Sequence, residues 1–118
     1  MAEGSKSKIK QLAQQIRDNP GDSFSKFALA LEFRKQYQLK NARILFEDIL
    51  KNDPGYVGVY YHLGKLYEEQ GRPVDARDLY EVGIQKAGNQ NKNRTKKELQ
   101  EALFNVEIEI DDQQNENL

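Results

Sequence analysis

The sequence predicts an all-α protein made of short helices that pack in antiparallel pairs. Apolar residues recur every three or four positions over most of the chain, as in Ile9, Leu12 and Ile16. Strand-like alternation is absent from the first hundred residues. Two proline–glycine turns, at Asn19–Asp22 and Asp53–Tyr56, interrupt the helical pattern at one fixed interval. Helices separated by short turns must reverse direction, so neighbouring helices are expected to pair.

The turns and the apolar stripes predict where each element lies. Helices are expected over 5–18 at the N-terminus, over 22–53 as a first pair, over 56–87 as a second pair, and over 94–110 at the end, with a polar linker from Gly88 to Asn93. Residues 1–112 are expected to form one domain, which suits a chain of 118 residues. Residues 113–118 are polar and acidic, and we expect them to be disordered.

The C-terminal segment fits two structures. Leu99, Leu103, Val106 and Ile110 share one helical face. The stretch 106–111 also alternates strictly between apolar and acidic residues, as a half-buried strand does. We favour a helix that frays near Ile110, because the sequence offers no second strand for pairing.

The chain aligns with itself after a shift of 34 residues. The two proline–glycine turns coincide, Leu29 falls on Leu63, and Ala42 falls on Ala76. Aromatic residues replace one another at three further positions, which are Phe27 and Tyr61, Phe33 and Tyr67, and Phe46 and Tyr80. A unit of two helices cannot bury its own apolar face, so repeats of this kind stack on their neighbours.

The second unit carries the pattern Tyr60-x-x-Leu63-Gly64-x-x-Tyr67, followed by Ala76-x-x-x-Tyr80. With this pattern the chain resembles the tetratricopeptide repeat family over residues 20–87. The first unit departs from the family pattern at Lys26, where a large aromatic residue is expected, and at Tyr37, where glycine is usual. The resemblance implies a short right-handed helical solenoid with an N-terminal half-repeat helix and a C-terminal capping helix.

Composition argues against catalysis. The chain has no cysteine and a single histidine, His62, so thiolate nucleophiles, cysteine zinc sites and multi-histidine metal sites are excluded. Glycine-rich phosphate loops and nucleophile elbows are also absent. We therefore expect no enzymatic activity, no cofactor and no metal. The net charge of −1 argues against nucleic acid, and the lack of a long apolar run argues for a cytoplasmic protein that binds no membrane.

The resemblance implies a non-catalytic scaffold that binds a protein partner. In stacks of this family the first helix of each pair lines a concave groove, which fits an extended or helical peptide. The matching positions that we expect to contact such a peptide are Phe27, Leu31, Arg34, Tyr61, Lys65 and Glu68. The alternative is that Phe24 and Phe27 pack under a terminal helix and belong to the core.

One subset of the family holds acidic chaperone tails with lysine and asparagine side chains on the first helices. The corresponding positions here are Phe27, Leu31 and His62, so that clamp is absent and we expect a more apolar ligand.

A second functional hypothesis is a self-assembling structural protein, because an exposed end helix can continue the stack into another molecule. The charges near the C-terminus are unevenly placed, with a basic cluster from Lys86 to Lys97 and an acidic end from Glu107 to Glu116. We interpret these charges as solvated helix surface.

Overall fold

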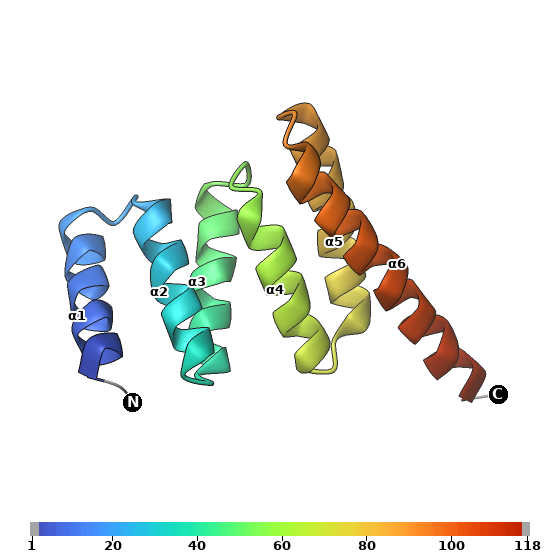
Figure 1. The fold of residues 1–118 in the computed structure, drawn as a ribbon, viewed down its shortest axis with the longest axis horizontal. Helices are drawn as coiled ribbons and strands as arrows, with labels where there is room; N and C mark the ends of the chain where they lie inside the picture. Colours follow the sequence, from blue (N-terminus) through green and yellow to red (C-terminus); the bar gives the residue numbers. More distant parts are fainter. Residues whose placement is uncertain (1–2, 117–118) are drawn as a thin grey trace. The chain divides into compact units, whose positions relative to one another are not determined.

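The computed structural model of the chain describes residues 3–116. Within them the chain forms six helices and no strands (Figure 1), which confirms the predicted fold class. The helices are α1 (Glu3–Asp18), α2 (Ser23–Lys35), α3 (Leu39–Asn52), α4 (Gly58–Glu69), α5 (Pro73–Asn89) and α6 (Asn93–Glu116). By their contacts they form two compact units, one that ends at Tyr56 and one that begins at Val57. The prediction of a single domain over 1–112 stays a prediction.

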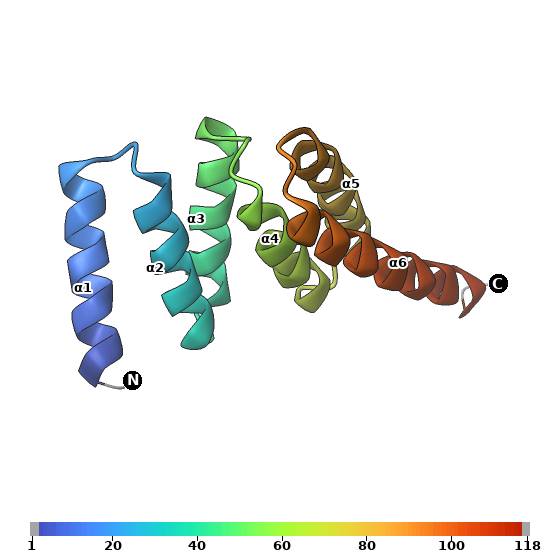
Figure 2. The same ribbon diagram turned by 45° about the horizontal axis from the view of Figure 1, so that its top comes forward.

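Unit 1 holds α1, α2 and α3, which run antiparallel and side by side in both views (Figure 2). The close approach of α2 and α3 is possible because Ala30 and Ala42 are small, and both are fully buried. Phe46 of α3 is also fully buried and fills the space between the two helices. Packing of α1 on α2 includes an ion pair of 3.2 Å between Lys8 Nζ and Glu32 Oε1.

The N-terminus of α2 is capped by a side chain. Oδ1 of Asp22 accepts a hydrogen bond of 3.1 Å from the backbone N–H of Ser25. The Ser25 hydroxyl lies 2.6 Å from Asp22 Oδ2 and 3.0 Å from the side-chain oxygen of Gln15 on α1. Because Ser25 is buried, this small polar cluster fixes where α2 begins and how α1 meets it.

Unit 2 holds α4, α5 and α6, and two glycines set how closely these helices approach. A Cβ atom at Gly64 would collide with the ring of Tyr80, which crosses from α5. A Cβ atom at Gly83 would lie 2.7 Å from Tyr60 Cβ and 3.0 Å from Leu99 Cδ1. At Gly83, helix α5 therefore lies so close to α4 and α6 that there is no room for a side chain between them.

The C-terminal helix corrects two boundaries. The segment that also fitted a strand is helical, but α6 continues to Glu116, so the predicted end near residue 110 and the predicted disorder of 113–116 are wrong. Residues 117–118 of that predicted tail lie outside the described residues. The helix continues because Ile110 still packs into unit 2, and acidic and amide side chains beyond it tolerate helical geometry.

The polar linker is also shorter than predicted. Helix α5 continues through Gly88 and Asn89, and α6 already begins at Asn93, which leaves a turn of three residues. Asn91 in this turn has a positive φ of 58°, a conformation that asparagine adopts more readily than most residues. Within residues 3–116, none of the helices has both the length and the apolar character required to cross a membrane.

Candidate interaction faces on α2 and α4

The α2 face, which we define as Phe27, Leu31 and Arg34, lies in unit 1. Spacings of four and three residues place these side chains on one side of the helix. All three are half-buried, so each rests on the unit while part of it stays accessible. The face combines an aromatic and an aliphatic surface with a guanidinium group at its C-terminal end.

Phe27 has a structural role as well as an exposed surface. Its ring centroid lies 5.9 Å from that of Phe46 and 5.3 Å from that of Tyr56, which is the last residue of the second proline–glycine turn. Burial is the largest cause that raises the pKa of the Tyr56 hydroxyl, followed by the charges of Asp53 and Asp22. Phe27 therefore belongs to an aromatic cluster of unit 1. Phe24 does not pack under a terminal helix, since it is 68% exposed.

The α4 face, which we define as Tyr61, Lys65 and Glu68, lies in unit 2 and has the same spacing. Lys65 Nζ is 5.7 Å from the centroid of the Tyr61 ring and 3.9 Å from Glu68 Oε2. The Tyr61 ring also meets the ring of His62 edge-on, at 5.6 Å between centroids. The lysine is thus held between an aromatic ring and a carboxylate, which orders the face before any ligand binds.

The carboxylate of Glu68 is positioned by Tyr80, a buried residue of α5. The Tyr80 hydroxyl donates a hydrogen bond to Glu68 Oε2. Burial first, and then this hydrogen bond, raises the pKa of Tyr80 far above its ordinary value, so the hydroxyl remains a donor at any physiological pH. The sequence did not predict this contact, because the two residues lie on different helices and only the fold brings them together.

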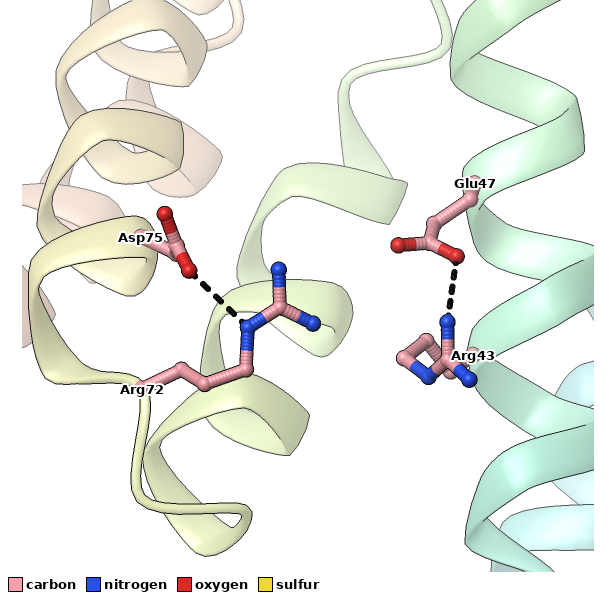
Figure 3. Close-up of polar contacts among 4 residues, drawn as sticks. All are labelled: Arg43, Glu47, Arg72 and Asp75. Atoms are coloured by element: carbon pink, nitrogen blue, oxygen red, sulfur yellow. Dashed lines mark hydrogen bonds and ion pairs between the residues drawn. The ribbon is translucent and has the colours of Figure 1, made fainter.

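Charged side chains elsewhere form local helix-surface pairs (Figure 3). On α3, Arg43 Nη1 lies 2.9 Å from Glu47 Oε1. At the start of α5, Arg72 Nε lies 2.9 Å from Asp75 Oδ2, and the Arg72 guanidinium also lies 4.0 Å from the ring centroid of Tyr67. Exposed pairs of this kind contribute at most about 1 kcal/mol each, so they shape the surface without forming a site.

Among the described residues, no three histidine, cysteine or acidic side chains lie close enough together to bind a metal ion. His62 is half-buried on α4, next to Tyr61. The arrangement that the structure does offer is two helix faces with mixed aromatic, aliphatic and charged groups, one in each unit. Such faces suit the binding of another chain.

Comparisons with known proteins agree with the repeat pattern. A tetratricopeptide repeat family model matches residues 33–93. The solution structure of a tetratricopeptide repeat domain protein from Salinibacter ruber is 44% identical, with a TM-score of 0.72, and the match covers 75% of this chain and 90% of that one. No curated protein sequence matches the chain.

Two further solved structures share the fold. The TPR2B domain of yeast Sti1, in its complex with pHsp70, has a TM-score of 0.79 at 15% identity, over 86% of this chain and 81% of that one. Protein BPP2914 from Bordetella parapertussis has a TM-score of 0.73 at 25% identity, over 86% of this chain and 88% of that one. The likeness to Sti1 concerns the fold alone.

Proposed function

Because the chain belongs to the tetratricopeptide repeat family, we propose that it is a non-catalytic protein-interaction module, in which the α2 face of unit 1 and the α4 face of unit 2 are each a surface for a peptide or a helix. Proteins built from these repeats generally serve as interaction scaffolds. The single observation that carries the proposal is that all six residues of the two faces are half-buried. Half-buried aromatic and aliphatic groups are held in place by the fold and still lose further surface to water when a ligand covers them.

The chemistry of the faces supports a mainly apolar ligand. The positions that would grip an acidic tail are Phe27 and Leu31, and neither can pair with a carboxylate. Arg34 and Lys65 offer single positive charges, and Glu68 offers a negative one. We therefore expect a ligand with two or three apolar anchors and few charges. The complex of Sti1 with pHsp70 supports ligand binding by this fold and does not identify the ligand of this chain.

The experiment that tests the proposal is a peptide selection followed by calorimetry. Peptides are selected on the immobilised full chain from a random displayed library, and the best sequence is titrated against variants. Tyr61→Ala should weaken binding about tenfold, because it removes the ring that holds Lys65. Its effect on thermal unfolding should be small, because Tyr61 is only half-buried and its ring contacts two residues, His62 and Lys65, that are themselves half-buried.

Phe24→Ala is the matched control, since Phe24 is an exposed aromatic residue on α2 that is not part of the α2 face. Phe27→Ala is less informative, because the Phe27 ring also supports Phe46 and Tyr56. Equal loss of binding in the Phe24 and Tyr61 variants, or no selected peptide at all, would contradict the proposed faces.

A further inference from the structure

Helix α6 has a packed face and an exposed apolar face. Leu99, Ala102, Val106 and Ile110 are buried where α6 meets the rest of unit 2. On the opposite side Phe104 is 67% exposed and Ile108 is 47% exposed. Their spacing of four residues makes them neighbours on one stripe. The last turns of α6 lead away from α5 in both views (Figures 1 and 2).

The charges along α6 oppose its own dipole. The first turn, as described, contains no acidic residue, and Arg94, Lys96 and Lys97 lie near that end. The last turn contains no basic residue, and Asp111, Asp112 and Glu116 lie near that end. A single helix is stabilised by the opposite arrangement. A second helix that runs antiparallel would place each basic end next to an acidic end and convert this unfavourable pattern into a favourable one.

We infer that the exposed face of α6 binds the same face of a second copy of this chain, with the two helices antiparallel and a two-fold axis at Phe104. Lys97 lies seven residues before Phe104 and Asp111 seven residues after it. Seven residues are about two helical turns, so the three side chains share one stripe. The two-fold axis then brings Lys97 of each copy next to Asp111 of the other.

A second copy suits this face because the same stripe has an apolar centre, a basic residue at one end and an acidic residue at the other, so it is complementary to itself. A shallow hollow beside Phe104, lined by Lys97, Gln100, Glu101 and Asn105, can receive the Phe104 ring of the other copy. A self-complementary patch of this kind generates a closed dimer. None of these residues belongs to the α2 or α4 face, so the inference stands or fails separately from the proposed ligand binding.

The first test is sedimentation equilibrium of the full chain from about 5 µM to about 1 mM, where we expect a weak dimer with a Kd on the order of 100 µM, because the apolar centre is small. Phe104→Ala should raise this Kd about tenfold. Phe24→Ala is the control, since Phe24 is 68% exposed on α2 and should leave the Kd unchanged. Circular dichroism should show the same helix content for both variants.

The second test reverses the charges. Lys97→Glu alone, or Asp111→Lys with Asp112→Lys, should each weaken the dimer, and all three changes together should restore it. Restoration requires antiparallel helices, because parallel helices would place Lys97 next to Lys97. A chain that is strictly monomeric at 1 mM, a dimer that is unaffected by Phe104→Ala, or a triple variant without restoration would each overturn the inference. A strict monomer would leave the exposed α6 face to a partner of different sequence.

Discussion

The two repeats bury residues at the same positions of their second helices but differ in the side chains around those positions. In both, an alanine of the second helix and an aromatic residue four positions later are fully buried, as Ala42 and Phe46 in α3 and Ala76 and Tyr80 in α5. The second repeat adds a hydroxyl to the ring, and two other positions change with it. Glycine replaces alanine beneath the ring, and Glu68 accepts the hydroxyl hydrogen bond where the first repeat has Arg34. The difference shows that a buried polar ring needs both space and an acceptor.

The largest effect is expected from making the second repeat resemble the first at Gly64. Gly64→Ala should destabilise the protein by about 3 kcal/mol, because the added methyl group collides with the ring of Tyr80 rather than with a flexible side-chain end. The reverse change, Ala30→Gly, should cost only about 1 kcal/mol, the usual penalty for glycine within a helix. Urea unfolding measures both. A neutral or stabilising Gly64→Ala would mean that the second repeat has room for a methyl group at this position, as the first repeat does at Ala30.

A second difference lies at the position where Lys26 replaces the buried aromatic residue Tyr60. Lys26 Nζ lies 2.7 Å from Asp48 Oδ2, and the side chain of Lys26 is only 11% exposed. Asp48→Ala should therefore cost about 1–2 kcal/mol, because it leaves a nearly buried ammonium group without its partner and Asp48 itself is partly solvated.

Adding Lys26→Met to the Asp48→Ala variant should recover most of the lost stability, since the flexible apolar side chain of methionine can occupy the space of the lysine side chain. Urea unfolding of the single and double variants gives the coupling between the two positions. If Asp48→Ala alone is neutral, the ion pair does not stabilise the first repeat.

The third difference lies in the turn between the helices of each pair. Gly71 in the second repeat has a φ of 74°, and Tyr37 at the equivalent position has a φ of 59°. A bulky residue is strained in this region, and Tyr37 gains little from packing because it is 88% exposed. Tyr37→Gly should stabilise the protein by about 0.5–1 kcal/mol, after allowance for the greater freedom of glycine in the unfolded chain.

Gly71→Ala is the matched control for Tyr37→Gly. A Cβ atom at Gly71 meets nothing within 4 Å, so any loss of stability arises from the backbone conformation alone. We expect a loss of about 1 kcal/mol by thermal unfolding. If Tyr37→Gly instead lowers the melting temperature, the exposed ring contributes contacts that outweigh the strain.

These differences also show what the sequence could predict. The apolar spacing predicted helices throughout, and the 34-residue period predicted two helix pairs, but neither predicted a boundary within either pair, and the last helix was predicted to end too early. The departures at Lys26 and Tyr37 were also visible in the sequence. The partner of Lys26 was not, since Asp48 lies on another helix and only packing brings the two together.

In the candidate site, too, the sequence did not show which residues from different elements come into contact. The resemblance to the family selected Phe27, Leu31 and Arg34 as contact positions, and their spacing places them on one side of α2. The sequence did not predict that Phe27 contacts the turn residue Tyr56, or that Glu68 is held by the hydroxyl of Tyr80. Both contacts join residues from different elements, and their geometry depends on how closely the helices approach. The end of α6 was predicted too early because acidic residues suggest solvent exposure and do not by themselves end a helix.

The smallest effect is expected at the helix starts. Asp22 caps α2 through its side chain, whereas the equivalent residue before α4 is Tyr56, and α4 has no side-chain cap. The hydrogen bond from the Ser25 hydroxyl is the main reason why the pKa of Asp22 lies below its ordinary value of 3.8. A lowered folded pKa stabilises the native state above the unfolded pKa, and this contribution is lost as the pH falls through the folded value.

We therefore expect acid to weaken the start of α2 before the start of α4. Amide hydrogen exchange in the first turn of each helix, compared at neutral pH and below pH 3.8, measures this difference directly. Asp22→Asn should remove the pH dependence at α2, because asparagine still caps a helix but does not titrate. Asp78→Asn on the exposed surface of α5 is the matched control and should leave the pH dependence at α2 unchanged. If both variants keep the wild-type response, the acid sensitivity of the first repeat does not come from its cap, and the difference between Asp22 and Tyr56 has no consequence for stability.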